Sequence, residues 1–260
     1  MLVPSLINPP HILDLDRETS LAEALTPSGR VLLLDWGSAR QRRRLTLTAH
    51  VRERLIPLLA SLGEPAALVG YCLGGTLALA AASEARTRGV VTLAAPWTFR
   101  GYAPASRAAV VRMRDEAWGP AQALGALPME VLQAAFWSLD PDRTVAKFAA
   151  FGSLAPGSTQ ARRFVALEDW ANGGEALPLA AAAELVDDLF QADLSGNGSW
   201  FGLPEIPTLH LTASDDRIVP SATAAPGERI AVPAGHVGMI VGRRAPESLH
   251  RPLNDWLARL

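Results

Sequence analysis

The chain contains a single cysteine, and the residues around it are those that a nucleophile requires. Cys72 lies in Gly70-Tyr71-Cys72-Leu73-Gly74, a small-x-nucleophile-x-small pattern between an apolar run and an alanine-rich helical run. A turn of this kind strains the backbone of the nucleophile and leaves no room for side chains at the flanking positions. It also aims the first N–H groups of the helix at the sulfur, which favours a thiolate. The alternative is a structural cysteine beside glycines that merely pack a helix on a strand.

An acid and a base follow in the order nucleophile, acid, histidine. Asp215 and Asp216 come after the apolar run 208–212, and His236 follows the run 229–232. Because ligands of open α/β sheets bind at the carboxyl ends of the strands, we expect these side chains to gather around Cys72. A simpler interpretation also stands, in which the aspartates cap the following turn and His236 is an ordinary loop histidine.

The elements that must position these residues alternate along the chain. Apolar runs predict strands at 31–34, 66–69, 90–94, 208–211 and 229–232. Helical periodicity is clear at 48–62, where Thr48 is the expected N-cap and Pro57 is expected to kink the helix. Helical patterns also follow Cys72 and end the chain. This alternation predicts a parallel sheet with right-handed crossovers.

Residues 97–204 differ from the rest of the chain. They show helical periodicity, many aromatic residues and no strand pattern. We therefore expect a single domain over residues 1–260 with a helical cap inserted at 97–204, over Cys72. Such a cap would exclude water from the site, although most of its aromatic side chains would simply form its own core.

Composition narrows the classes of function. The 24 basic and 26 acidic residues give a net charge of -2, which leaves no basic excess for nucleic acid. One cysteine excludes a disulfide framework and a multi-cysteine metal site. No apolar stretch reaches the ~18–20 residues of a membrane span, and the first residues lack a signal-peptide pattern. The sequence thus predicts a soluble, cytoplasmic protein with no nucleic-acid partner and no membrane span.

Several sequence blocks occur in a fixed order along nearly the whole chain. They are Val3-Pro4-Ser5-Leu6-Ile7-Asn8, His11-Ile12-Leu13-Asp14-Leu15, Leu34-Asp35-Trp36-Gly37, Gly70-Tyr71-Cys72-Leu73-Gly74-Gly75, Ala94-Ala95-Pro96-Trp97, Asp216-Arg217-Ile218-Val219-Pro220 and Gly235-His236. Together these blocks resemble the catalytic domain of polyhydroxyalkanoate synthases, and the double glycine after the cysteine is their most specific part.

The resemblance implies an α/β-hydrolase fold with a mostly parallel sheet and a helical cap. Met1 would fall inside a central strand, so the two strands that precede it in the full fold are expected to be lacking. The segment 31–34 would then be an exposed edge, next to the strand at Met1 and followed in order by the strands at 66–69, 90–94, 208–211 and 229–232.

The resemblance also assigns roles to single residues. Cys72 would be the nucleophile, His236 the base and Asp216 the acid, with Asp215 as the fallback. The nucleophile elbow would consist of Gly70, Gly74 and Gly75 around Cys72. Backbone N–H groups of Leu73 and Leu6 are expected to bind the oxyanion.

The implied reaction is the transfer of (R)-3-hydroxyacyl groups from CoA thioesters through Cys72 to a growing polyester, with no cofactor besides the CoA of the substrate. The expected partners are this substrate, the polyester product, and a second copy of the chain or a synthase partner subunit. Two alternatives remain open. One is a cysteine hydrolase with the same triad, a thioesterase, esterase or polyester depolymerase, and the other is a non-catalytic paralogue that binds polyester granules or a synthase.

Overall fold

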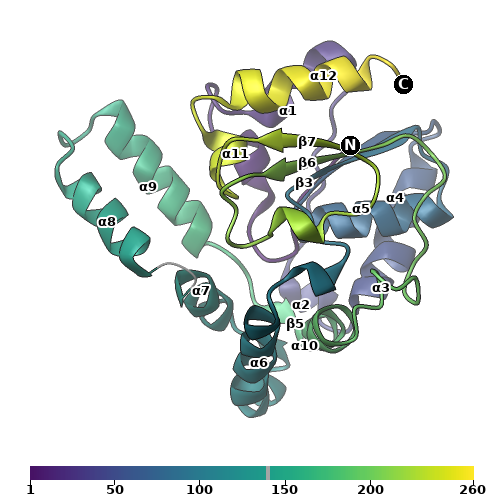
Figure 1. Ribbon diagram of the computed structural model, residues 1–260, viewed down its shortest axis with the longest axis horizontal. Helices are drawn as coiled ribbons and strands as arrows, with labels where there is room; N and C mark the ends of the chain where they lie inside the picture. Colours follow the sequence, from purple (N-terminus) through teal and green to yellow (C-terminus); the bar gives the residue numbers. More distant parts are fainter. Residues whose placement is uncertain (139–140) are drawn as a thin grey trace.

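A parallel sheet lies at the centre of the computed structural model, which describes residues 1–138 and 141–260. The strand order is β1 (Leu2–Val3), β2 (Ala67–Tyr71), β3 (Gly89–Leu93), β6 (Thr208–Ala213) and β7 (Glu228–Val232) (Figure 1). The predicted strand at 31–34 contributes a single parallel bridge, between Leu33 and Leu2, outside β1. The predicted strand order is therefore confirmed, with 31–34 at the edge of the sheet.

Helices cover both faces of this sheet (Figure 1). On one face α5 (Leu73–Glu84) packs beside a continuous helical segment made of α3 (Leu47–His50), the π-helical η3 (Val51–Leu55) and α4 (Ile56–Ser61). The other face is covered by α1 (Leu21–Ala24), α11 (Gly238–Val241), η7 (Pro246–His250) and α12 (Arg251–Leu257). Burial of both faces explains why the central strands are continuously apolar. Short connecting elements are η1 (Pro10–Asp14), η2 (Thr26–Ser28), α2 (Ala39–Arg42) and η6 (Ser221–Thr223).

The helical segment at 47–61 begins differently from the expectation. Its N-cap is Thr46, whose hydroxyl accepts the N–H of Ala49 at 3.0 Å, so the assignment of the cap to Thr48 is wrong. Both threonines fit a cap by residue type, and only the backbone turn decides between them. Pro57 follows the π-helical η3, so the irregularity expected from a proline takes the form of a wider helical turn before it.

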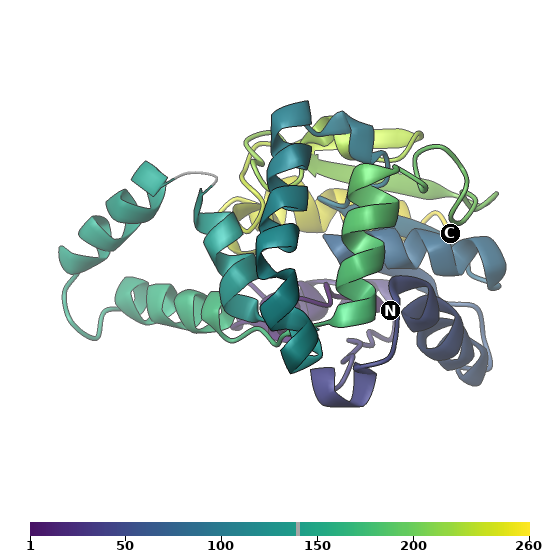
Figure 2. The ribbon, with the colours of Figure 1, turned by 90° about the horizontal axis from the view of Figure 1, so that it is seen from below.

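The cap segment (residues 97–204) connects β3 to β6. It contains η4 (Phe99–Gly101), α6 (Pro104–Leu124), α7 (Met129–Ser138), α8 (Pro141–Gly152), α9 (Thr159–Asn172), α10 (Leu179–Ala183) and the π-helical η5 (Glu184–Gln191). Two short strands, β4 (Ala126–Leu127) and β5 (Leu177–Pro178), pair antiparallel within it, so the expectation of no strand here is wrong. Two-residue strands are too short to produce a period-two pattern. Figures 1 and 2 show α8 and α9 extending away from the sheet.

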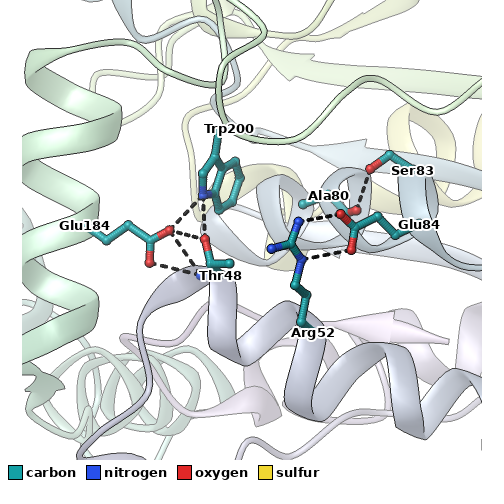
Figure 3. Close-up of polar contacts among 7 residues, drawn as sticks. All are labelled: Thr48, Arg52, Ala80, Ser83, Glu84, Glu184 and Trp200. Carbon is teal, nitrogen blue, oxygen red and sulfur yellow. Dashed lines mark hydrogen bonds and ion pairs between the residues drawn. The ribbon is translucent and has the colours of Figure 1, made fainter.

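A buried carboxylate joins the end of the cap segment to the core. Glu184, at the start of η5, is 9% exposed and accepts the N–H of Thr48 at 3.0 Å and the indole N–H of Trp200 at 2.7 Å (Figure 3). The hydroxyl of Thr48 also donates to this carboxylate. A buried carboxylate requires such donors, so the contact fixes η5 against α3.

Candidate active site

Cys72 occupies the sharp turn between β2 and α5. Its backbone angles, φ 55° and ψ −133°, lie in a region that residues with side chains rarely adopt. The N–H of Cys72 donates to the carbonyl of Leu93 at 2.9 Å, and its own carbonyl accepts the N–H of Gly75 at 2.9 Å. Backbone strain held in place by such bonds concentrates at functional sites.

The three glycines of the turn are required by close contacts. A Cβ on Gly70 would lie 2.4 Å from the Cα of Gly75, and a Cβ on Gly75 would lie 2.4 Å from the Cβ of Ala95. These two glycines let α5 approach the sheet. A Cβ on Gly74 would lie 2.2 Å from the carbonyl oxygen of Val3, so this glycine brings the loop after β1 against the elbow.

The structure brings Asp216, and not Asp215, to His236. The Nδ1–H of His236 donates to Oδ2 of Asp216 at 2.6 Å. Oδ1 of Asp216 accepts the N–H groups of Ile218 and Val219, each at 2.8 Å, which fixes the carboxylate. The Asp216 side chain is fully buried, whereas Asp215 is exposed.

The imidazole of His236 and the side chain of Cys72 line the same cavity. Because Asp216 binds Nδ1 of His236, Nε2 is the ring nitrogen left for a second partner. Burial alone lowers the pKa of His236, but the charge of the neighbouring Cys72 and the hydrogen bond to Asp216 outweigh it and raise this pKa to about 10. The arrangement therefore places a readily protonated imidazole beside the cysteine of the elbow.

Tyr71 supports His236 in a way that sequence reasoning missed. Its hydroxyl donates to the backbone carbonyl of His236 at 3.2 Å, and the centres of the two rings are 5.0 Å apart. Burial raises the pKa of Tyr71 well above 10, so the hydroxyl stays a neutral donor. The residue stands inside the elbow motif, but nothing in that motif distinguishes a supporting tyrosine from a packed one.

The loop after β1 forms the other side of the site. Leu6 is 3% exposed, and its N–H donates to no acceptor within residues 1–138 and 141–260. By contrast, the N–H of Ile7 reaches Oγ of Ser5 at 3.3 Å. Leu73 opens α5, where the first N–H groups have no intrahelical acceptor. The predicted oxyanion donors, Leu6 and Leu73, are thus both available to a charged oxygen.

A cavity of about 170 Å³ opens beside Cys72 and His236. Proline and aliphatic side chains of the loop after β1 line one wall, and the cap segment lines another. The lining residues from the cap are Gln133, Trp137, Lys147, Trp170 and Ala171, of which the two tryptophans belong to the aromatic residues that mark this segment in the sequence. The cavity is therefore largely apolar and is bordered by α7, α8 and α9 above the elbow.

In the described part of the chain, no group of three His, Cys, Asp or Glu side chains could hold a metal ion. Among the helices formed by residues 1–138 and 141–260, none is long and apolar enough to cross a membrane.

Comparisons with known proteins agree with this geometry. The model of the alpha/beta hydrolase family matches residues 12–247. The chain is 26% identical to the poly(3-hydroxyalkanoate) polymerase subunit PhaC of Haloferax mediterranei, over 99% of this chain and 58% of that protein. It is 25% identical to the corresponding subunit of Allochromatium vinosum, over 99% of this chain and 79% of that protein. The chain thus spans little more than half the length of the Haloferax relative.

A solved structure shares the fold. A hydrolase from Pseudomonas aeruginosa PA01 superposes with a TM-score of 0.63 at 19% sequence identity, covering 98% of this chain and 88% of that one. The predicted α/β-hydrolase fold with a mostly parallel sheet is confirmed. The chain belongs to the alpha/beta hydrolase family, and within that family its sequence resembles the poly(3-hydroxyalkanoate) polymerase subunits.

Proposed function

We propose that this protein is an acyltransferase of the polyhydroxyalkanoate synthase type. It would transfer (R)-3-hydroxyacyl groups from CoA thioesters through Cys72 to a growing polyester. The observation that carries the proposal is the strained position of Cys72 beside the hydrogen-bonded pair His236 and Asp216. Similarity to polymerase subunits supports the class of substrate.

The first step forms an acyl-enzyme. His236 takes the proton of the Cys72 thiol, and the resulting thiolate attacks the carbonyl carbon of the substrate thioester. The N–H groups of Leu73 and Leu6 stabilise the oxyanion of the tetrahedral intermediate. When this intermediate collapses, the bond to the CoA sulfur breaks, and CoA leaves with the proton from His236.

The second step forms the polyester bond. The hydroxyl of another hydroxyacyl unit attacks the acyl carbon on Cys72, His236 takes the hydroxyl proton, and the Cys72 sulfur leaves as a thiolate. An acyl group on sulfur keeps nearly the transfer potential of the CoA thioester, so it can still esterify an alcohol. The same acyl group on a serine would already be a stable ester.

The cavity favours an alcohol over water as the acceptor. Its walls next to Cys72 are mainly proline, aliphatic and tryptophan side chains. Such walls disfavour ordered water and accommodate the methylene groups of a hydroxyacyl chain. Hydrolysis remains the competing reaction, because the same triad activates water equally well.

The test is to incubate the protein with (R)-3-hydroxybutyryl-CoA and to measure released CoA, polymer and free 3-hydroxybutyrate. We expect CoA release with polymer as the main product, and no release by a Cys72→Ala variant. Free acid as the only product would make the protein a hydrolase, and no Cys72-dependent release would leave the granule-binding or synthase-binding alternative.

The association with a second copy or a partner subunit stays a prediction, which light scattering of the purified protein tests.

A further inference from the structure

Trp36, from the Leu34-Asp35-Trp36-Gly37 block, has no part in the mechanism above, yet its indole reaches the loop that carries Leu6. The Nε1–H of Trp36 donates to the carbonyl oxygen of Pro4 at 2.9 Å. A Cβ on Gly74 would lie only 2.4 Å from this same oxygen. The indole therefore holds the loop at the point where the loop meets the nucleophile elbow.

Trp36 is itself held by a buried polar cluster. The ring of His50, which is fully buried, stands edge-on to the indole with ring centres 5.7 Å apart. Nδ1–H of His50 donates to the carbonyl of Thr46 at 2.6 Å, and Nη1 of Arg42 lies 3.4 Å from Nε2 of His50. Burial lowers the pKa of His50 to about 4, so the neutral ring accepts from Arg42. Since Arg42 also donates to the carbonyl of Gly37 at 3.0 Å, the residues around Trp36 form a rigid support.

The far end of the loop is fixed in a similar way. The indole N–H of Trp170, in α9, donates to the carbonyl of Pro9 at 2.9 Å. The side-chain amide of Asn8 donates to the carbonyl of Ala171 at 3.2 Å. The indole N–H groups of Trp36 and Trp170 thus bind the two ends of the segment 4–9. Leu6 lies between these ends, and its N–H donates to no acceptor in the described residues.

We propose that Trp36 is a positioning residue that holds the N–H of Leu6 in place for the oxyanion. The inference rests on the proposed function, because it assumes that Cys72 is acylated. A backbone N–H stabilises an oxyanion only in the correct direction and distance, and a displacement of about 1 Å can cost about 100-fold in rate. The bond to Pro4 restrains the loop two residues before Leu6.

The test compares two reactions of Cys72 in a Trp36→Phe variant, which keeps a ring but loses the N–H. Acylation by (R)-3-hydroxybutyryl-CoA or by p-nitrophenyl butyrate passes through an oxyanion, whereas alkylation by iodoacetamide does not. We expect kcat for acylation to fall about 10- to 100-fold with little change in KM, and the alkylation rate to stay within about twofold of wild type.

The matched control is Trp256→Phe, because Trp256 is 5% exposed and packs in the core on the other face of the sheet. This variant should acylate at the wild-type rate. An unchanged acylation rate in Trp36→Phe, or an equal fall in acylation and alkylation, would overturn the positioning role. If wild-type protein reacts with p-nitrophenyl butyrate but not with the CoA thioester, the proposed substrate is wrong, while the role of Trp36 is still decided by the ester.

Discussion

At the scale of single residues, replacing the sulfur of Cys72 should impair the reaction far more than the stability of the fold. Cys72→Ser changes the side-chain volume little, so the free energy of unfolding should change by only about 1 kcal/mol. Turnover of hydroxyacyl-CoA should fall more than about 100-fold, because a serine hydroxyl is far less acidic and an acyl-serine resists transfer to an alcohol. CoA release and urea denaturation measure the two effects. Wild-type turnover in this variant would show that Cys72 is structural.

His236 reports on the charge of Cys72. An NMR titration of the imidazole should give a pKa of about 10 in the wild type and a lower one in Cys72→Ser. The reason is that the charge of Cys72 is one of the influences that raise the pKa of His236. The same pKa in both proteins would mean that the thiolate and the imidazolium do not interact.

The raised pKa of His236 also makes the stability of the protein depend on pH. A proton on His236 stabilises the folded protein relative to an unfolded chain in which the ordinary pKa is 6.5. The contribution is complete below pH 6.5 and is lost as the pH rises through about 10. In urea denaturation, the advantage of the wild type over His236→Gln should therefore shrink across this range, and an advantage that grows with pH would contradict the assignment.

At the scale of elements, the contact between α5 and the loop after β1 depends on a missing side chain. Gly74→Ala would place a Cβ 2.2 Å from the carbonyl oxygen of Val3, so the helix and the loop must separate. We expect a loss of about 1–3 kcal/mol in stability together with most of the acylation activity. Gly152→Ala, where nothing lies within 4 Å of the new Cβ, is the matched control and should be neutral. Equal behaviour of the two variants would refute the contact.

The contact that fixes η5 of the cap segment against α3 should depend on Glu184. Glu184→Ala leaves the N–H of Thr48 without its buried acceptor, and the indole N–H of Trp200 keeps only its bond to Oγ1 of Thr48 at 2.9 Å. This loss should cost about 1–3 kcal/mol. Glu84→Ala removes an exposed ion pair with Arg52 close by (Figure 3) and should have little effect. Thermal unfolding compares the stability of the two variants. A smaller loss of stability in Glu184→Ala than in Glu84→Ala would show that Glu184 does not hold the cap segment against the core.

The sequence predicted the elements of the sheet well and the details of the helices less well. Apolar runs such as 90–94 indicate buried strands, and their alternation with helices along the chain implies a parallel sheet. The N-cap at Thr46 depends on the backbone turn, and the pairing of β4 with β5 depends on residues about 50 positions apart. Neither contact leaves a periodic pattern in the sequence.

At the scale of the whole molecule, the site exists because parallel strands end at one edge of the sheet. Leu6, Cys72, Asp216 and His236 follow β1, β2, β6 and β7, so the topology gathers residues from both ends of the chain. Motif and chain order were enough to predict this gathering. They could not predict the supporting contacts of Tyr71 and Trp36 or the lining of the cavity, because these depend on how distant segments pack.

In the proposed reaction, Cys72 carries the acyl group between CoA and the acceptor. The most direct measurement is mass spectrometry of the intact protein, quenched in acid shortly after mixing with (R)-3-hydroxybutyryl-CoA, followed by peptide mapping. This role of Cys72 predicts a mass increase by hydroxybutyryl units on the peptide that contains Cys72, an equal amount of CoA released in the first turnover, and no adduct in Cys72→Ala. CoA release without an adduct on Cys72, or undiminished release by Cys72→Ala, would contradict it.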